Sequence, residues 1–439
     1  MTPGTSHEHA ARRTPHPPSP KASAGRRRTR RRDLHALVLV IALVFTGWPI
    51  FAQTPAPAPG ALTLDAALAL AMSGNLTIAA ARLRRPVDVA GIGVADERPN
   101  PEFTVESTRE TPRQAFSALF PIELGGKRQA RVGLATAAVT TGEAETDRII
   151  ALVRSDVRRA YFEVVAAERR VTAATESRDV ARRVHDTAQT SFGLGEKAQI
   201  DVYLTDVDLA VTENDVTGAQ SELTATHAEL NTLLGRAPGA PLQLADELVA
   251  TPLPPLEALV ARASADNADL RVLDRGIAEQ NARLGLARAL RAPDVSVGGG
   301  VTFNAQPDFS LGYRAAFTMT VPLFTHHDAG VAVENAELTR LGGERAALIA
   351  GITGAVAAAR ARAEGAREQL ARFQSDILPG AARVAQMQEA AYRAGQTNVN
   401  VLLEALKSAA DLRAKAIEAG LDYQRALADL ERALGVSIK

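Results

Sequence analysis

Two short stretches of the sequence carry residues that could do chemistry. Residues Pro121–Arg128 read PIELGGKR, and residues 326–328 read His-His-Asp. A Gly-Gly-Lys run is typical of loops whose backbone amides bind phosphate. A Walker A loop also needs Gly five positions before the glycine of its Gly-Lys pair, and Ser or Thr after the lysine. Pro121 and Arg128 occupy those positions here, so the sequence argues against an ATPase.

The same stretch is better explained as a joint between a strand and a helix. Pro121 is predicted to end the strand, Gly125 and Gly126 to turn the backbone, and Lys127 and Arg128 to begin the helix. His326, His327 and Asp328 lie at the corresponding place later in the chain. Adjacent histidines point in different directions on most backbones, and no third ligand follows at a fixed spacing. We therefore predict a polar junction here and no metal site.

The beginning of the chain has the layout of an export signal. Residues 1–33 are basic and Pro-rich, ten apolar residues follow at Ala36–Phe45, and a small-residue site lies near Ala52. We predict a signal peptide at 1–52 and a linker at 53–61. Removing residues 1–52 takes away nine Lys/Arg and two Asp/Glu, which leaves 41 basic and 48 acidic residues and a net charge of −7. A basic segment can bind nucleic acid, but the mature chain's charge makes a nucleic-acid partner improbable.

Residue types that are missing narrow the function further. The sequence contains no cysteine, which excludes disulfides, thiolate metal sites and an anchor on a lipid-modified Cys. Neither a nucleophile elbow nor an HExxH motif is present, and only four histidines remain after residue 52. We predict no catalytic residue and no cofactor, with an exported enzyme left as an alternative. The sequence also shows no run of 18 or more apolar residues, so any membrane crossing is expected to use strands.

The chain repeats itself at an offset of two hundred residues. Ser191–Gly195 aligns with Ala391–Gly395, and Leu234-Gly235 aligns with Leu434-Gly435. Repeat 1 is predicted at 62–237, with a β-hairpin at 101–121 and long helices at 126–190 and 198–235. Repeat 2 is predicted at 256–436, with a hairpin at 293–322 that ends at Pro322 and long helices at 329–390 and 398–435. A linker at 238–255 joins the repeats.

The predicted strands and helices are unusual in pattern and length. In the second hairpin, large apolar residues alternate with small or polar ones over about ten residues per strand, as in a membrane barrel with a wet lumen. Apolar and Ala positions follow 3-4 spacing from Ile150 to Ala174, which predicts a coiled-coil seam in a rod of roughly 100 Å. Pro379-Gly380 is expected to kink or interrupt the long helix at 329–390.

Four strands are too few for a closed barrel, which needs about eight. The barrel must therefore be shared. Three copies would supply a 12-stranded β-barrel continued by twelve helices, which makes the chain mainly α with a membrane β part.

This order of elements resembles the TolC family of outer-membrane efflux channels. The FGLG and YRAG turns at 192–195 and 392–395 carry the resemblance, which covers about 62–436. PIELGGKR and the earlier RPNPEF resemble the CzcC-like, heavy-metal branch. The resemblance implies a homotrimer in outer-membrane lipid that extends into the periplasm. It also implies two protein partners, a periplasmic adaptor (membrane fusion) protein and an inner-membrane resistance-nodulation-division pump.

The resemblance also implies roles for particular residues. Gly195, Asp201 and Gly395 are expected at the periplasmic tip that the adaptor binds, and Glu404 at the pore constriction. Family members carry acids six and nine positions after the second glycine. Here those positions hold Val401 and Glu404, and the six-position acid occurs only in repeat 1, as Asp201. Pro121, Gly125, Gly126 and Pro322 are expected at the barrel-to-helix junctions.

The sequence thus predicts the channel of a tripartite efflux system, with heavy-metal cations as cargo. Two alternatives stay open. The first is the same channel serving drugs or type I secretion, and the second is a periplasmic coiled-coil scaffold without a pore.

Overall fold

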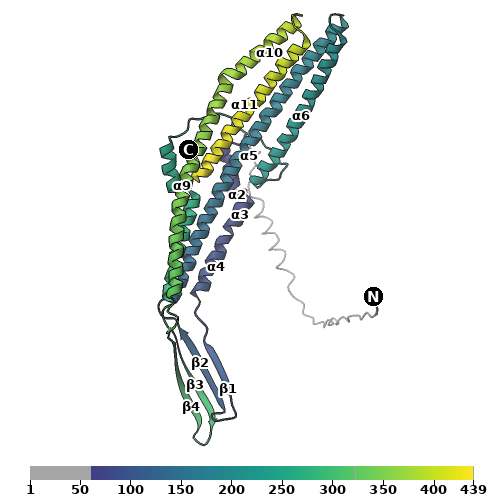
Figure 1. Cartoon of the computed structure of the whole chain (residues 1–439). Helices are drawn as coiled ribbons and strands as arrows, with labels where there is room; N and C mark the ends of the chain where they lie inside the picture. Colours follow the sequence, from purple (N-terminus) through teal and green to yellow (C-terminus); the bar gives the residue numbers. More distant parts are fainter. Residues whose placement is uncertain (1–60, 322, 439) are drawn as a thin grey trace, which may run out of the picture. The chain divides into compact units, whose positions relative to one another are not determined.

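The computed structural model describes residues 61–321 and 323–438 (Figure 1). The predicted signal peptide, nearly all of the 53–61 linker and Pro322 lie outside the described residues. The described residues belong to one structural unit, Gly60–Lys439.

Both repeats run in the order short helices, two strands, long helix, tight turn and second long helix (Figure 1). In the first repeat the structure has α2 (Leu64–Gly74), α3 (Leu76–Arg82), α4 (Arg84–Asp96), β1 (Glu102–Ser107), β2 (Gln114–Ile122), α5 (Lys127–Gly193) and α6 (Gln199–Leu233). In the second it has α7 (Leu256–Asp266), α8 (Ala268–Ala289), β3 (Asp294–Ala305), β4 (Phe309–Thr320), α9 (Asp328–Arg372), η1 (Phe373–Ile377), α10 (Leu378–Arg393) and α11 (Val399–Leu434).

The four strands form one antiparallel sheet in the order β1-β2-β3-β4. Its register places nearly all of the large apolar residues on one face, because Val105 pairs with Phe116, Phe116 with Val301, and Val301 with Tyr313; Leu119, which pairs with Gly298, is the exception on the other face. The opposite face carries Thr104, Ser117, Gly298, Gly300, Thr302 and Thr318. The first hairpin therefore follows the same two-faced pattern as the second, although its sequence shows it less cleanly.

Two glycines on the polar face lie where β2 and β3 come very close together. A Cβ atom on Gly298 would lie 2.2 Å from the carbonyl oxygen of Ala118, and one on Gly300 would lie 2.3 Å from that of Phe116. No side chain fits at such distances, so the backbones of β2 and β3 approach closely on this side. Glycine at these two positions thus allows a close approach of the two strands on the polar face, opposite the apolar one.

The helices pack along the seam that the 3-4 spacing predicted. Val153, Val157, Val164 and Ala167 of α5 are buried, and the three valines join Leu230 of α6 and Leu234, directly after α6, in the largest apolar cluster. A second cluster joins α7 and α8 to α9 and α11. Since α5 has 67 residues at about 1.5 Å each, its length is roughly 100 Å.

The inter-repeat linker is fastened to the helices by two buried tyrosines. The hydroxyl of Tyr161 on α5 lies 2.7 Å from the carbonyl oxygen of Leu62 and 2.8 Å from Asp246 Oδ2. Burial and the hydrogen bond with Asp246 raise the pKa of Tyr161. The Tyr423 hydroxyl on α11 donates to the carbonyl of Thr251 at 2.8 Å. The linker thus ties the two repeats together at one level of the helices.

The expected interruption at Pro379 takes a milder form. The helix continues from α9 to α10 through a π-helical turn at Phe373–Ile377, which ends two residues before Pro379. The wider π-helical turn accommodates the hydrogen bond that is lost because proline has no backbone N–H. The helix is therefore locally distorted but continuous.

One described helix could span a membrane by its length and composition, although the sequence holds no unbroken run of 18 apolar residues. By length and composition alone, the continuous helix Asp328–Arg393 qualifies, with an 18-residue window of mean hydropathy 1.3 that is 22% buried. The bent pair Leu64–Gly74 and Leu76–Asp96 would qualify if it formed a single span. The Ala, Val, Leu and Ile residues of Asp328–Arg393 raise its mean hydropathy, but Gly, Thr and charged residues between them prevent an unbroken apolar run.

Candidate functional site: the helical tip and the barrel junction

Two tight turns end the helices at the point farthest from the sheet (Figure 1). Gly195 and Gly395 follow α5 and α10 with φ of +77° and +71°. At the first turn Gly195 N–H donates to Phe192 and Glu196 N–H to Ser191, both at 2.9 Å; the second turn repeats both bonds from Gly395 and Gln396. These bonds make each turn a Schellman motif, which needs a left-handed residue. Both predicted glycines therefore have a backbone reason to be glycine.

A buried cluster joins the two turns. We call α5 with α6 the first helical hairpin and α10 with α11 the second helical hairpin. Val184 of α5 packs with Tyr392 of α10 and with Val399 and Leu402 of α11, and all four are at most 4% exposed. The ammonium group of Lys197, in the first turn, lies 4.9 Å from the centre of the Tyr392 ring. Burial, and then the negative charge of Asp201, raises the pKa of the Tyr392 phenol. The cluster therefore holds the first helical hairpin against the second.

The predicted tip residues do not all belong to this cluster. Asp201 lies in the first turn of α6 and acts on Tyr392, whereas the Glu404 side chain is exposed on α11 and forms no ion pair with any described residue. Sequence reasoning missed Lys197 and the role of Tyr392. The aromatic residue at the same place in both repeats, Phe192 and Tyr392, was the available signal.

At the other end of the helices, the GGKR residues form the joint between sheet and helix. Lys127 is only 6% exposed and forms an ion pair with Asp294 at the start of β3. Arg128 binds the carboxylate of Asp96 at 2.7 Å and its carbonyl at 2.8 Å. Arg131 donates to the Ala95 and Glu97 carbonyls and to Glu123. The bond from Arg131 holds the pKa of Glu123 below its usual range.

Both glycines of this joint have a left-handed backbone, and Gly125 also has no room for a side chain. Gly125 and Gly126 adopt φ of +68° and +71°. A Cβ atom on Gly125 would also lie 2.3 Å from the Cβ of Ala292, so α5 approaches the end of the α8 segment too closely for a side chain. These basic side chains bind protein carboxylates and carbonyls, which leaves no phosphate-binding role for the stretch.

His326 and His327 lie at the corresponding joint of the second repeat. His327 has φ of +57° and immediately precedes α9, in the position that Gly126 occupies before α5. Asp328 forms an ion pair with Arg291. Among the residues described, no group of three or more His, Cys, Asp or Glu side chains could hold a metal ion.

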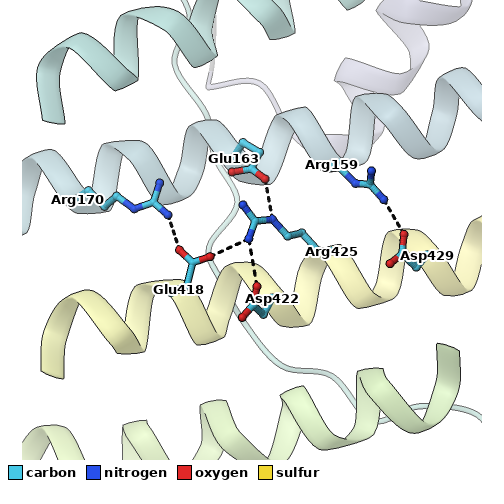
Figure 2. Close-up of polar contacts among 7 residues, drawn as sticks. All are labelled: Arg159, Glu163, Arg170, Glu418, Asp422, Arg425 and Asp429. Atoms are coloured by element: carbon cyan, nitrogen blue, oxygen red, sulfur yellow. Dashed lines mark hydrogen bonds and ion pairs between the residues drawn. The ribbon is translucent and has the colours of Figure 1, made fainter. Parts of the chain in front are cut away.

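A ladder of ion pairs connects α5 to α11 between the tip and the sheet (Figure 2). Arg425 lies between Glu163 at 2.8 Å, Glu418 at 2.7 Å and Asp422 at 3.1 Å. Glu418 also pairs with Arg170, and Arg159 pairs with Asp429, both at 2.6 Å. The ladder links repeat 1 to repeat 2 over several helical turns.

We expect this ladder to make the seam acid-sensitive through Glu418. Burial opposes ionisation of Glu418, but hydrogen bonds from Arg170 and Arg425 outweigh it and lower its pKa. The stabilisation is therefore fully present above the unfolded pKa of about 4.3 and is lost as pH falls through the folded value. Glu418→Gln should unfold with less pH dependence below about pH 4.5.

Urea unfolding followed at pH 7 and at pH 3.5 tests this. The acid-induced loss in the free energy of unfolding should be larger for wild type than for E418Q by at most about 1 kcal/mol. The effect is small because the Glu418 side chain is 45% exposed and solvent screens it. An equal acid-induced loss in both proteins would contradict the assignment.

Comparison with known proteins identifies the family to which this chain belongs. A family model described as outer membrane efflux protein matches residues 67–236 and 259–436, one segment in each repeat. The chain belongs to the outer membrane efflux protein family. Its TolC-like fold accounts for the two-faced sheet, the long helices and the repeated tip.

Individual relatives of this efflux protein agree with the assignment. The cobalt-zinc-cadmium resistance protein CzcC of Cupriavidus metallidurans is 26% identical over 395 residues, which cover 89% of this chain and 94% of CzcC. A crystal structure of CusC superposes with a TM-score of 0.70 and 17% identity, covering 85% of this chain and 92% of that one. The Campylobacter jejuni CmeC outer membrane channel gives a TM-score of 0.70 and 15% identity, covering 85% of each chain.

Proposed function

We propose that this protein is the outer-membrane channel of a tripartite efflux system that exports heavy-metal cations. The proposal that heavy-metal cations are the cargo rests on the similarity to the cobalt-zinc-cadmium resistance protein, which extends over nearly the whole of both chains. The channel role is supported by the family match and by a sheet with one largely apolar face and one face of mostly small or polar residues.

The proposed assembly is a homotrimer. A single sheet leaves both β1 and β4 as free edges, and an exposed apolar edge pairs with another chain. Three copies close a 12-stranded barrel in the outer membrane and continue it as an α-helical barrel in the periplasm. Residues 1–52 would serve as the signal peptide. With no cysteine in the sequence, no acyl chain can be attached through Cys.

The tip residues receive their roles within this assembly. Gly195, Asp201 and Gly395 form the end that a periplasmic adaptor binds, and the adaptor connects it to an inner-membrane resistance-nodulation-division pump. Glu404 contributes one carboxylate from each copy to a ring at the pore constriction, where negative charge favours cations. The channel conducts passively and the pump supplies the energy. The prediction that Pro121 ends the strand is off by one residue, because Pro121 pairs with Ser296 inside β2 and the strand ends at Ile122, which we place at the membrane boundary.

Cellular metal content tests the proposed cargo. In a clean deletion strain we expect zinc, cobalt and cadmium to accumulate several-fold above wild type, and the complemented strain to return to the wild-type level. A panel of hydrophobic drugs measured in parallel should show no retention. Retention of drugs without metals would keep the channel and overturn its cargo.

Purified protein tests the pore separately from the cargo. Trimers in planar bilayers should conduct, and Glu404→Gln should lower cation-over-anion selectivity. Unchanged selectivity would remove Glu404 from the constriction, and absence of any conductance would favour the scaffold alternative.

A further inference from the structure

Three apolar side chains near the tip are exposed in the single chain. Phe192 at the end of α5 is 42% exposed, Val384 on α10 is 54% exposed, and Val401 on α11 is 40% exposed. In the wall of helices, α5 packs against both α6 and α11, and α10 packs against α11. Helices α6 and α10 therefore lie at the two opposite edges near the tip (Figure 1).

The internal repeat supplies a partner for each of these side chains. Within the chain, Val184 of the first helical hairpin packs against Tyr392 of the second, and Asp201 lies close enough to act on the same ring. Shifting these residues by the repeat offset of two hundred gives Val384, Phe192 and Val401. The exposed residues are therefore the repeat counterparts of the buried contact.

The two sets also differ in a concerted way. Tyr392 faces Lys197 and Asp201 in the contact within the chain. The counterparts of these three residues are Phe192, Thr397 and Val401. The phenol, the cation and the anion are all replaced, and the result is an apolar ring opposite an apolar side chain. Such a matched change is expected where the three positions meet one another a second time, with no hydroxyl left to satisfy.

We propose that Phe192 of one copy packs against Val384 and Val401 of the neighbouring copy and forms a second tip seam. This inference rests on the proposed trimer and adds the register of its tip. The tip then has six seams, three within chains and three between them. The seam between copies joins the second helical hairpin of one chain to the first helical hairpin of the next. This is a head-to-tail contact that closes into a ring.

A cysteine-free chain allows a direct test by paired thiols. Phe192→Cys with Val384→Cys, oxidised in purified detergent-solubilised trimers, should give covalent dimers and trimers on a non-reducing denaturing gel. The counterpart pair, Val184→Cys with Tyr392→Cys, should join within one chain and leave its mass unchanged. Phe192→Cys with Gln386→Cys is the negative control, because Gln386 lies about 200° around α10 from Val384.

Each outcome decides. At least a fivefold higher yield of covalent oligomer from the Phe192–Val384 pair than from the Phe192–Gln386 pair would support the seam. Intact trimers with no such difference would overturn the seam and leave the trimer standing. Light scattering of the unmodified protein gives the copy number independently, and a monomer there would overturn both the assembly and the seam.

A second readout distinguishes another copy from an adaptor as the occupant. A single Phe192→Cys in the free trimer should react with a bulky maleimide at least tenfold more slowly than Gln386→Cys. Equal rates would mean that the surface is open in the trimer, and would overturn the proposal.

Discussion

Gly298→Val should abolish the outer-membrane form of the protein. A Cβ atom at Gly298 would lie 2.2 Å from the Ala118 carbonyl oxygen and 3.0 Å from the Cα of Leu119, both in the backbone of β2. Backbone atoms cannot move aside as a flexible side chain can, so the β2–β3 pairing must separate. That pairing joins the two hairpins and therefore the two repeats. We expect at least a tenfold loss of heat-resistant oligomer in the outer-membrane fraction.

Gly299→Ala is the matched control for this prediction. Gly299 is the next residue of the same strand, but its side-chain position faces the apolar side, where the nearest atom is the Arg314 carbonyl oxygen at 3.3 Å. A methyl group there needs a shift of only a few tenths of an ångström. The control should retain most of the wild-type oligomer. Equal losses in the two variants would show that strand glycine content matters and that the close approach of β2 and β3 does not.

Arg158→Met should cost about 3–5 kcal/mol in the free energy of unfolding, because it leaves a buried carboxylate without its cation. Arg158 of α5 pairs with Glu431 of α11 at 2.9 Å, and the two side chains are only 14% and 10% exposed. Arg158 also lies 5.7 Å from the ring centre of Phe162. The backbone N–H of Ile438 donates to Glu431 at 2.9 Å but carries no charge to replace the guanidinium.

The adjacent residue offers a control of the same chemistry. Arg159 pairs with Asp429 at 2.6 Å, but these side chains are 41% and 48% exposed (Figure 2). Solvent screens such a pair, so Arg159→Met should cost less than about 1 kcal/mol. Urea unfolding of both variants in detergent, followed by circular dichroism at the helical band, measures the difference. Equal costs would mean that burial does not set the strength of the α5–α11 contacts.

The architecture followed from patterns that act over short distances. The alternation in the second hairpin predicted its strands, the 3-4 spacing predicted the buried face of α5, and the repeated Gly195 and Gly395 turns predicted where the long helices reverse. These signals are strong because side-chain direction in a strand or helix depends on the backbone period alone. The π-helical turn before Pro379 was not predictable in the same way, since proline permits several local adjustments.

The candidate site was only half predictable. Position in the repeat was enough to name Gly125, Gly126, Gly195 and Gly395, whose left-handed backbone the structure displays. It did not predict that Lys127 would be buried against Asp294, or that Lys197 would cover Tyr392. Each of these contacts joins residues more than a hundred positions apart, and their meeting depends on how the two repeats pack.

The sequence by itself thus determined the repeat, the elements, the two faces of each strand and the family resemblance, because each is a local or periodic property of the chain. Only the tertiary structure decided that β2 pairs with β3 and approaches it closely at Gly298 and Gly300. It also decided which charges meet on α5 and α11, and which apolar residues stay uncovered at the tip. Those outcomes depend on distances between segments remote in sequence, which packing alone sets.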